Sequence, residues 1–166
     1  MTGCCHHAKR QDAVNPAEGD IARTPAGDAL TTLILRVVFL SHAFTAKGEA
    51  LAKPTGQTLA RWVALDAVAD TPATVAEISR RFGYARQSVQ RVADLLVQDG
   101  LATYEDNPRH RRAKLLRPTP RGRRILHAIN SDQKVWSDAL GARIGEADLT
   151  SASRVLDRLL AAMHEE

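Results

Sequence analysis

Five polar residues near the middle of the chain are of the types that contact nucleic-acid bases. Arg can donate two parallel hydrogen bonds to guanine, Gln can both donate to adenine and accept from it, and Ser can do either. They crowd the first turns of an expected helix, and a helix of this kind fits the major groove of duplex DNA. The candidates for base contact are Arg86, Gln87, Ser88, Gln90 and Arg91.

The alternative interpretation is a helix with an ordinary solvated face, since most Gln and Arg side chains on helices are simply hydrated. Helix-turn-helix patterns also occur by chance in unrelated sequences. The segments on either side of this helix favour the first interpretation.

A short helix is expected directly before these residues. Thr74 and Glu77 have the spacing of a capping box, in which each side chain binds the backbone N–H of the other residue. Gly83 can end that helix with a positive φ, and the second helix then begins near Arg86. Its buried stripe is expected to consist of Val89, Val92 and Leu96, supported by Ala93 and Leu95.

An arginine-rich hairpin is expected after the second helix. Leu101–Tyr104 and Ala113–Arg117 are predicted to pair as strands, with a turn at Asn107 and Pro108. A basic loop beside such a helix could follow the phosphates and insert a guanidinium into the minor groove. An edge hairpin kept soluble by its charge is the alternative. The candidate hairpin residues are Arg109, Arg111, Arg112 and Lys114.

Together these motifs resemble the MarR family of bacterial winged-helix regulators. The matching stretches are Glu77–Gly83, Arg86–Val92, Asp99–Leu101, Arg111–Lys114 and Thr119–Gly122. The resemblance implies an obligate homodimer on a pseudo-palindromic operator, with a recognition helix in each major groove and a wing arginine in each minor groove. It also implies a small aromatic effector bound between the DNA-binding and dimer parts.

Two positions depart from the family pattern. His110 stands where many members have an Asp that pairs with a wing arginine, so a looser wing is expected near neutral pH. Pro118 stands where an aliphatic residue is usual, and it is expected to end the second strand early. Thr119 and Pro120 are then the N-cap and the first residue of the next helix.

An effector pocket is predicted at His42, Arg61 and Trp62. Ser41 and His42 are adjacent on a helix, where their side chains point about 100° apart, so they do not form a nucleophile and base. A structural histidine within the helix bundle is the alternative role for His42. We find no phosphate-binding glycine loop and no carboxylates at metal-ligand spacing. The sequence therefore predicts no enzyme, no cofactor and no metal site.

Basic residues are concentrated in one segment of the chain. Residues 80–124 contain 12 Lys and Arg against 4 Asp and Glu, a net charge of +8, whereas the whole chain carries +4. A polyanionic partner follows, because phosphate contacts release counterions from nucleic acid. The hairpin tip lacks the Trp, Phe or Leu that would insert into a membrane surface.

The 166 residues, 44% of them hydrophobic, suit one helical domain. The winged helix-turn-helix is expected at residues 58–119, with Thr58–Asp70 as its first helix. Helices at residues 28–47 and 120–164 carry more apolar surface than one face needs, which predicts a two-fold dimer. The run Leu33–Leu40 is short and contains Arg36, so it is not expected to span a bilayer.

Residues 1–27 show no periodicity and are expected to form a disordered arm. Cys4, Cys5, His6 and His7 are adjacent within it and cannot surround one ion as spaced ligands do, so adventitious metal binding or cross-linking is favoured over a sensing role. The start of the chain lacks the apolar core of a signal peptide, which predicts a cytoplasmic protein.

The sequence thus predicts a mainly α protein with a small β-hairpin wing, a winged helix-turn-helix plus terminal dimerisation helices. The predicted function is sequence-specific DNA-binding transcriptional regulation, as a repressor released by a small-molecule effector. The expected partners are double-stranded DNA, a second copy of the chain and a small aromatic effector, with no membrane. A winged-helix protein-interaction module without specific DNA binding is the alternative.

Overall fold

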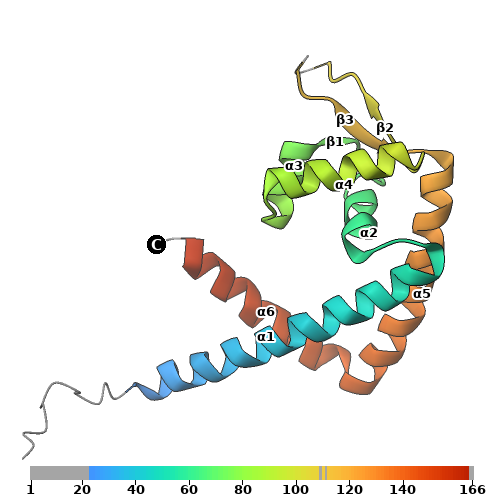
Figure 1. Cartoon of the computed structure of the whole chain (residues 1–166). Helices are drawn as coiled ribbons and strands as arrows, with labels where there is room; N and C mark the ends of the chain where they lie inside the picture. Colours follow the sequence, from blue (N-terminus) through green and yellow to red (C-terminus); the bar gives the residue numbers. More distant parts are fainter. Residues whose placement is uncertain (1–22, 109, 111, 165–166) are drawn as a thin grey trace, which may run out of the picture. The chain divides into compact units, whose positions relative to one another are not determined.

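The computed structural model describes residues 23–108, 110 and 112–164 (Figure 1). Most of the expected N-terminal arm, with Cys4 and Cys5, lies outside the described residues, and so do Arg109 and Arg111 of the hairpin. The rest is helical apart from one small antiparallel sheet, which confirms the predicted mainly α fold with a β wing.

The helices are α1 (Pro25–Ala52), the 3₁₀ helix η1 (Lys53–Thr55), α2 (Leu59–Asp66), α3 (Val75–Phe82), α4 (Arg86–Gln98), α5 (Pro120–Ile144) and α6 (Glu146–His164). The strands are β1 (Ala73–Thr74), β2 (Ala102–Glu105) and β3 (Leu115–Pro118). The chain divides into two compact units, residues 1–41 and 42–166, and α1 contributes to both.

The first unit contains the N-terminal part of α1. The helix begins at Pro25, so residues 25–27 do not belong to the expected arm. The Thr24 hydroxyl accepts the N–H of Gly27 at 3.1 Å, and a proline at the first helical position needs no N–H partner. The large apolar side chains of this part are exposed: Leu30, Ile34, Leu35, Val37, Val38, Phe39 and Leu40.

The continuous helical segment that begins with α1 is longer than the sequence pattern suggested. Over an 18-residue window within Pro25–Thr55 the mean hydropathy reaches 1.6, so length and composition would allow this segment to cross a membrane. The expectation concerned the run Leu33–Leu40 alone, and the helix that contains this run is long and apolar enough, although one such helix is weak evidence for a membrane.

The second unit contains the winged helix. Its first helix, α2, is shorter than the expected Thr58–Asp70, because the chain leaves the helix through a tight turn in which Val68 N–H bonds the Leu65 carbonyl. Thr58 is the N-cap, and its hydroxyl accepts the N–H of Arg61.

The sheet has three strands in the order β1-β3-β2 rather than the two expected. The two residues of β1 pair with Leu115 and Leu116, a contact too short to show in the sequence pattern. Pro118 does not end the second strand early. It is the last residue of β3, opposite Ala102, where no third strand requires its missing N–H.

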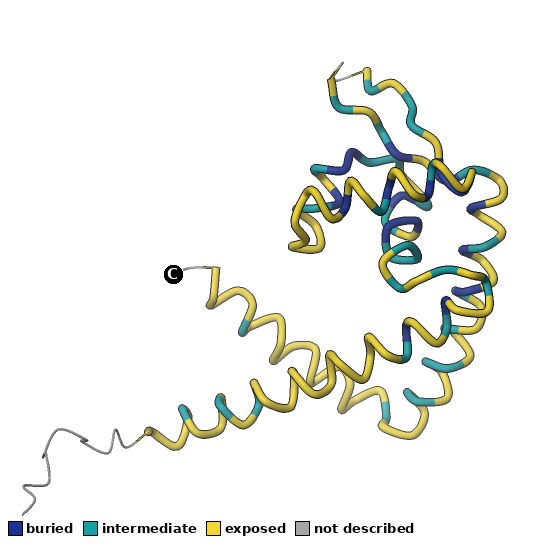
Figure 2. Tube along the Cα trace, viewed as in Figure 1, coloured by how far each residue is buried: buried dark blue, intermediate teal, exposed yellow. Residues whose placement is uncertain are grey.

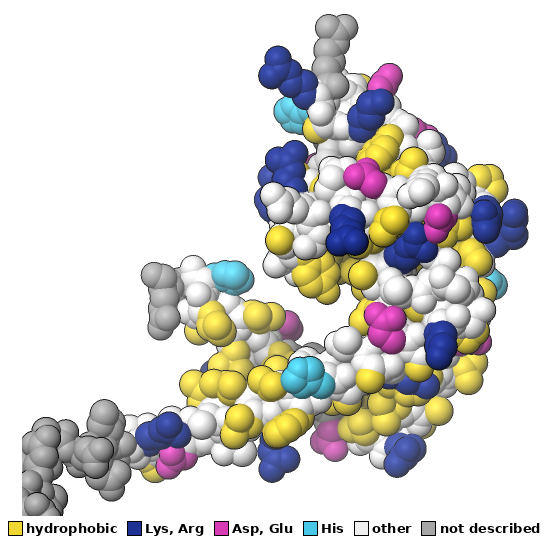
Figure 3. All heavy atoms as spheres, viewed as in Figure 1, with side chains coloured by type: hydrophobic (Ala, Val, Ile, Leu, Met, Phe, Trp, Pro, Cys, Tyr) yellow, Lys and Arg dark blue, Asp and Glu magenta, His cyan; other side chains and the backbone are white. Residues whose placement is uncertain are grey.

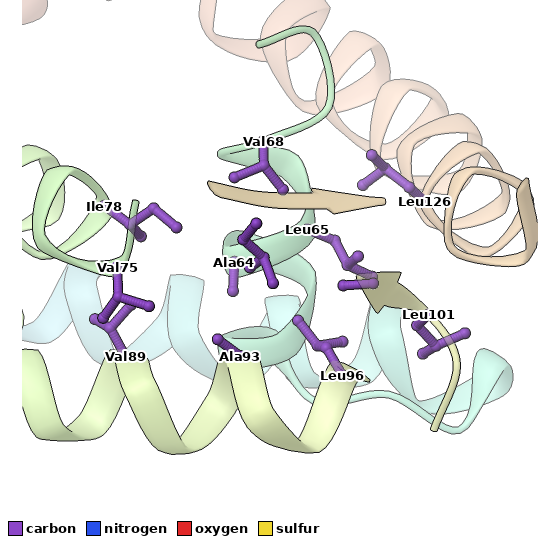
Figure 4. Packing of buried hydrophobic residues seen from close by; sticks show 12 residues of the cluster. Ala64, Leu65, Val68, Val75, Ile78, Val89, Ala93, Leu96, Leu101 and Leu126 are labelled. Carbon is purple, nitrogen blue, oxygen red and sulfur yellow. The ribbon is translucent and has the colours of Figure 1, made fainter. Parts of the chain in front are cut away.

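The core lies between α2, α3, α4, the strands and α5, and the labelled side chains in Figure 4 point toward one another there. Leu65 of α2 and Leu96 of α4 are fully buried. The buried stripe of α4 consists of Val89, Ala93 and Leu96, whereas Leu95 is 39% exposed and does not support it as expected. Figure 2 shows this concentration of buried residues and the contrasting exposure of α6.

The N-terminus of α5 packs very closely against Gly100 and Leu101, which lie between α4 and β2. Thr119 caps α5, as predicted, by accepting the N–H of Gly122, and its own hydroxyl bonds the Gly100 carbonyl at 2.8 Å. A Cβ on Gly122 would lie 1.9 Å from the Leu101 carbonyl oxygen. Only glycine permits this contact without a backbone shift, because the Leu101 carbonyl cannot rotate away as a flexible side chain could.

We therefore expect Gly122→Ala to lower the free energy of unfolding by roughly 1–3 kcal/mol, since overpacking forces backbone shifts. Urea unfolding measures this change. The matched control is Gly141→Ala, whose Cβ would lie 3.8 Å from Leu149 in ordinary contact. The control is expected to be as stable as the wild type or more so. Equal stability of both variants would contradict the close approach.

Candidate nucleic-acid interface

The predicted capping box is present at the start of α3. Glu77 N–H donates to the Thr74 hydroxyl at 3.2 Å, and the Glu77 carboxylate accepts the Thr74 N–H at 2.7 Å. This hydrogen bond from the backbone, followed by one from the Thr74 hydroxyl, lowers the pKa of Glu77. Gly83 then ends α3 at a φ of 68°, so α4 follows within a short turn.

One face of α4 is polar and exposed. Arg86, Gln87, Gln90 and Arg91 line a shallow groove of about 510 Å³. Figure 3 shows Lys and Arg side chains gathered over α3, α4 and the hairpin. Four of the five predicted base-contact residues therefore share one surface.

The fifth predicted residue, Ser88, lies on another face of α4. It lines a different cavity, together with Val89 and Val92, on the apolar side of the helix. Two positions along a helix separate Ser88 from Gln90, and their side chains consequently point about 200° apart. The sequence pattern grouped residues by proximity along the chain and missed this difference in direction.

The hairpin extends the polar surface of α4. A second groove of about 240 Å³ is lined by Arg112 and Lys114 of the hairpin together with Arg86 and Gln90 of α4. The structure thus brings two of the four predicted hairpin residues to the predicted helix. Cross-strand pairing supports the hairpin, since Arg117 binds Glu105 at 3.0 Å.

A three-residue hydrogen-bond network connects the helix to the hairpin. The Gln90 Nε2 atom donates to Asp94 Oδ1 and to the Tyr104 hydroxyl, and the Tyr104 hydroxyl donates to Asp94 Oδ1, each at 2.8 Å. Burial, and then the hydrogen bond to Asp94, raises the pKa of Tyr104 to about 12. Sequence analysis missed both partners of Gln90, although a Gln and an Asp four residues apart on a helix are a known pair.

This network limits which atoms of Gln90 are available to a partner outside the chain. A glutamine that reads adenine uses its amide nitrogen and its oxygen together. In this structure the nitrogen already binds Asp94 and Tyr104. Gln87 makes no such bond within the part of the chain that the structure describes.

The predicted effector pocket of His42, Arg61 and Trp62 does not assemble. A largely apolar cavity of about 540 Å³ is lined by Trp62, Phe44 and Trp136, among others, but not by His42 or Arg61. Arg61 turns instead to Asp99, with 2.6 Å between Nη2 and Oδ2. His42 is exposed. Phe44 and Trp136 meet edge to face, with 6.1 Å between ring centroids.

Across the described residues, no group of three or more His, Cys, Asp or Glu side chains is arranged to hold a metal ion.

The Tyr104 network can be tested without DNA. In a Tyr84→Phe variant, Tyr104 is the remaining tyrosine, and its absorbance should titrate near pH 12. Asp94→Asn should lower that midpoint toward 10, while burial keeps it above the ordinary value. A folded protein whose tyrosine titrates near pH 10 in both backgrounds would contradict the network. Because the folded state raises the pKa of Tyr104 from about 10 to about 12, the protonated tyrosine stabilises the fold. This contribution to the free energy of unfolding is complete below pH 10 and is lost as the pH rises toward 12.

Comparisons with known proteins agree with this arrangement. A sequence model of the MarR family matches residues 55–113. The uncharacterized protein Rv2011c of Mycobacterium tuberculosis is 38% identical over 139 residues, which cover 84% of this chain and 97% of that protein.

Solved structures share the fold. A MarR family transcription regulator, SP03579, has a TM-score of 0.72 at 24% identity, covering 84% of this chain and 95% of its own. The Staphylococcus aureus MarR in complex with salicylate and kanamycin has a TM-score of 0.71 at 19% identity, covering 83% and 95%. A Listeria monocytogenes MarR family regulator complexed with 26mer DNA has a TM-score of 0.71 at 14% identity, covering 80% and 89%. With its capped helix-turn-helix, its basic hairpin and these relatives, the chain belongs to the MarR family of winged-helix transcriptional regulators.

Proposed function

We propose that this protein is a cytoplasmic, non-enzymatic repressor that binds a pseudo-palindromic DNA operator as a homodimer and is released by a small aromatic effector. The observation that carries the proposal is the shared surface of α4 and the hairpin. On it, Arg86 and Arg91 lie beside Gln87, and Arg112 and Lys114 adjoin Arg86. Cations there would bind phosphates, and the amides would contact base edges.

The proposed DNA contact follows from the direction of each side chain. The stripe of Val89, Ala93 and Leu96 is buried in the core, so the opposite face of α4 is available to the major groove. Arg112 and Lys114 lie on the hairpin, where they can reach the backbone or the minor groove beside it. The complex of the Listeria monocytogenes regulator with DNA supports this assignment by its shared fold.

The proposed homodimer follows from apolar surface that the described chain leaves exposed. The large exposed side chains of α6 are Leu149, Val155, Leu156, Leu160 and Met163. The N-terminal part of α1 is similarly apolar and exposed. A second copy of the chain would cover such surfaces, and two-fold symmetry would place two winged helices on two half-sites. The preferred occupant is a second copy rather than a bilayer, because the basic winged helix needs access to DNA.

The proposed effector would occupy the cavity at Trp62, Phe44 and Trp136. Its volume of about 540 Å³ and its aromatic lining suit a small aromatic molecule. The Trp62 indole donates to Asn130 of α5 at 2.7 Å, and α2, which carries Trp62, packs directly on α4. A ligand that displaces Trp62 could therefore shift the recognition helix. The salicylate complex of the Staphylococcus aureus protein supports this choice of ligand class.

Binding to a random-sequence duplex tests the DNA contact. We expect affinity to fall steeply with salt, because each phosphate contact releases counterions. Arg112→Ala should reduce the slope of log K against log salt by about one unit. Arg143→Ala, which removes an exposed charge at the end of α5, is the matched control and should leave the slope unchanged. Absence of binding at low salt would support the protein-interaction alternative.

Sedimentation tests the dimer. Leu156→Glu places a charge on the exposed apolar face of α6 and should yield monomers or aggregates, since an unpaired charge is costly in an interface. Deletion of residues 1–20 removes none of the exposed apolar residues of α1 or α6 and should leave the dimer intact. A soluble Leu156→Glu monomer that binds DNA as well as the wild type would overturn the dimer assignment.

A further inference from the structure

We propose that Asp94 and Tyr104 are positioning residues that hold the Gln90 amide with only its oxygen available to DNA, so that Gln90 selects a base carrying an amino group. This inference rests on the proposed function and deepens it, because it assigns a base class to one residue of the recognition helix. The bases with an amino group in the major groove are adenine and cytosine.

The Asp94 carboxylate determines which way the amide faces. A carboxylate only accepts hydrogen bonds, so the group it meets must be a donor. The Gln90 nitrogen lies 2.8 Å from Asp94 Oδ1. Rotation of the amide by 180° would bring its oxygen against the carboxylate, and two acceptors would repel each other. The Asp94 carboxylate therefore requires the Gln90 amide to face it with its nitrogen rather than its oxygen.

The Tyr104 hydroxyl fixes the same orientation from the hairpin. Its one hydrogen is directed to Asp94 Oδ1, so toward Gln90 it can only accept. The Gln90 nitrogen again supplies the donor, at 2.8 Å. This hydroxyl is protonated throughout the neutral range, since even an ordinary tyrosine has a pKa of about 10 and that of Tyr104 is raised to about 12. Asp94 on α4 and Tyr104 on β2 thus impose one amide orientation, and Asp94 also sets the direction of the Tyr104 hydroxyl.

The Gln90 oxygen remains available for an outside partner. It makes no hydrogen bond within the described parts of the chain, and Gln90 lines both grooves of the candidate interface. A free acceptor in the major groove matches the amino group of adenine or cytosine. Guanine and thymine present acceptors in the major groove and would repel it.

Orientation of the Gln90 amide also explains why an acidic residue, Asp94, lies among the arginines of α4. Asp94 lines the same groove as Arg86 and Arg91, where its charge opposes the attraction of phosphates. An orienting carboxylate lowers non-specific affinity and increases the difference between bases. Gln87, one helical turn before Gln90, has no such neighbour among its described contacts and keeps both donor and acceptor for readout.

Selection from a randomised duplex pool tests the inference. The proteins to compare are the full-length wild type, Gln90→Ala, Tyr104→Phe and Asp94→Asn. The first substitution identifies the base position that Gln90 contacts. There the wild type should prefer adenine or cytosine on the contacted strand by roughly three- to tenfold, the ratio that one hydrogen bond provides.

Tyr104→Phe and Asp94→Asn should change the base preference only at the position that Gln90 contacts. Tyr104→Phe should weaken the preference, and Asp94→Asn, which has the same shape but can also donate, should let the amide rotate and admit guanine or thymine. Matched controls remove a hydroxyl or a charge elsewhere: Tyr84→Phe at the turn before α4, and Asp138→Asn, which pairs with Lys134 on α5. Both controls should keep the wild-type profile.

Three outcomes would overturn the inference. Two of them leave the proposed function intact, and the third overturns it as well. A profile that changes in Gln90→Ala but is unchanged in both positioning variants overturns the inference alone. A wild-type preference for guanine or thymine at the Gln90 position does the same. A wild type that binds no duplex overturns the proposed function together with it.

Discussion

The orientation of α4 depends on one apolar stripe, and the interface depends on that orientation. Val89, Ala93 and Leu96 are buried against a core to which Leu65 of α2 and Leu116 of β3 also belong. Rotation of α4 about its axis would expose this stripe and bury charged side chains, at a cost of several kcal/mol. The core therefore fixes which residues α4 presents to the solvent. Arg86, Gln87, Gln90 and Arg91 consequently share one surface, whereas Ser88 does not.

The hairpin and α4 form one polar surface, joined by hydrogen bonds. Tyr104 of β2 reaches the Gln90–Asp94 pair on α4, so the position of the hairpin affects the direction of the Gln90 amide. Trp62 connects α2 to α5 and also lines the apolar cavity of about 540 Å³. Direct contacts thus connect that cavity through α2 to α4. Through these contacts a ligand bound in the cavity could shift α4 and so change its fit to DNA.

Local signals in the sequence predicted much of the fold, and interactions between distant segments explain the rest. The capping box of Thr74 and Glu77 and the Thr119–Pro120 start of α5 depend on residues within one helical turn, and both were predicted correctly. Strand β1 was missed because only its pairing with β3 defines it. Tyr104 was missed because it meets Gln90 across 14 residues, and the Arg61 partner Asp99 lies 38 residues away. For the same reason the sequence placed Arg61 with Trp62 in a pocket, whereas Arg61 pairs with Asp99 and does not line the cavity at Trp62.

We propose that the polar face of α4 enters the major groove at two related half-sites. Dimethyl sulfate methylates guanine N7, which lies in the major groove, so protection of this atom in a selected duplex reports the contact directly. We expect two protected patches about one helical turn apart, both weakened when Arg86 and Arg91 are replaced by alanine. Binding that leaves guanine N7 fully reactive at both half-sites would contradict it.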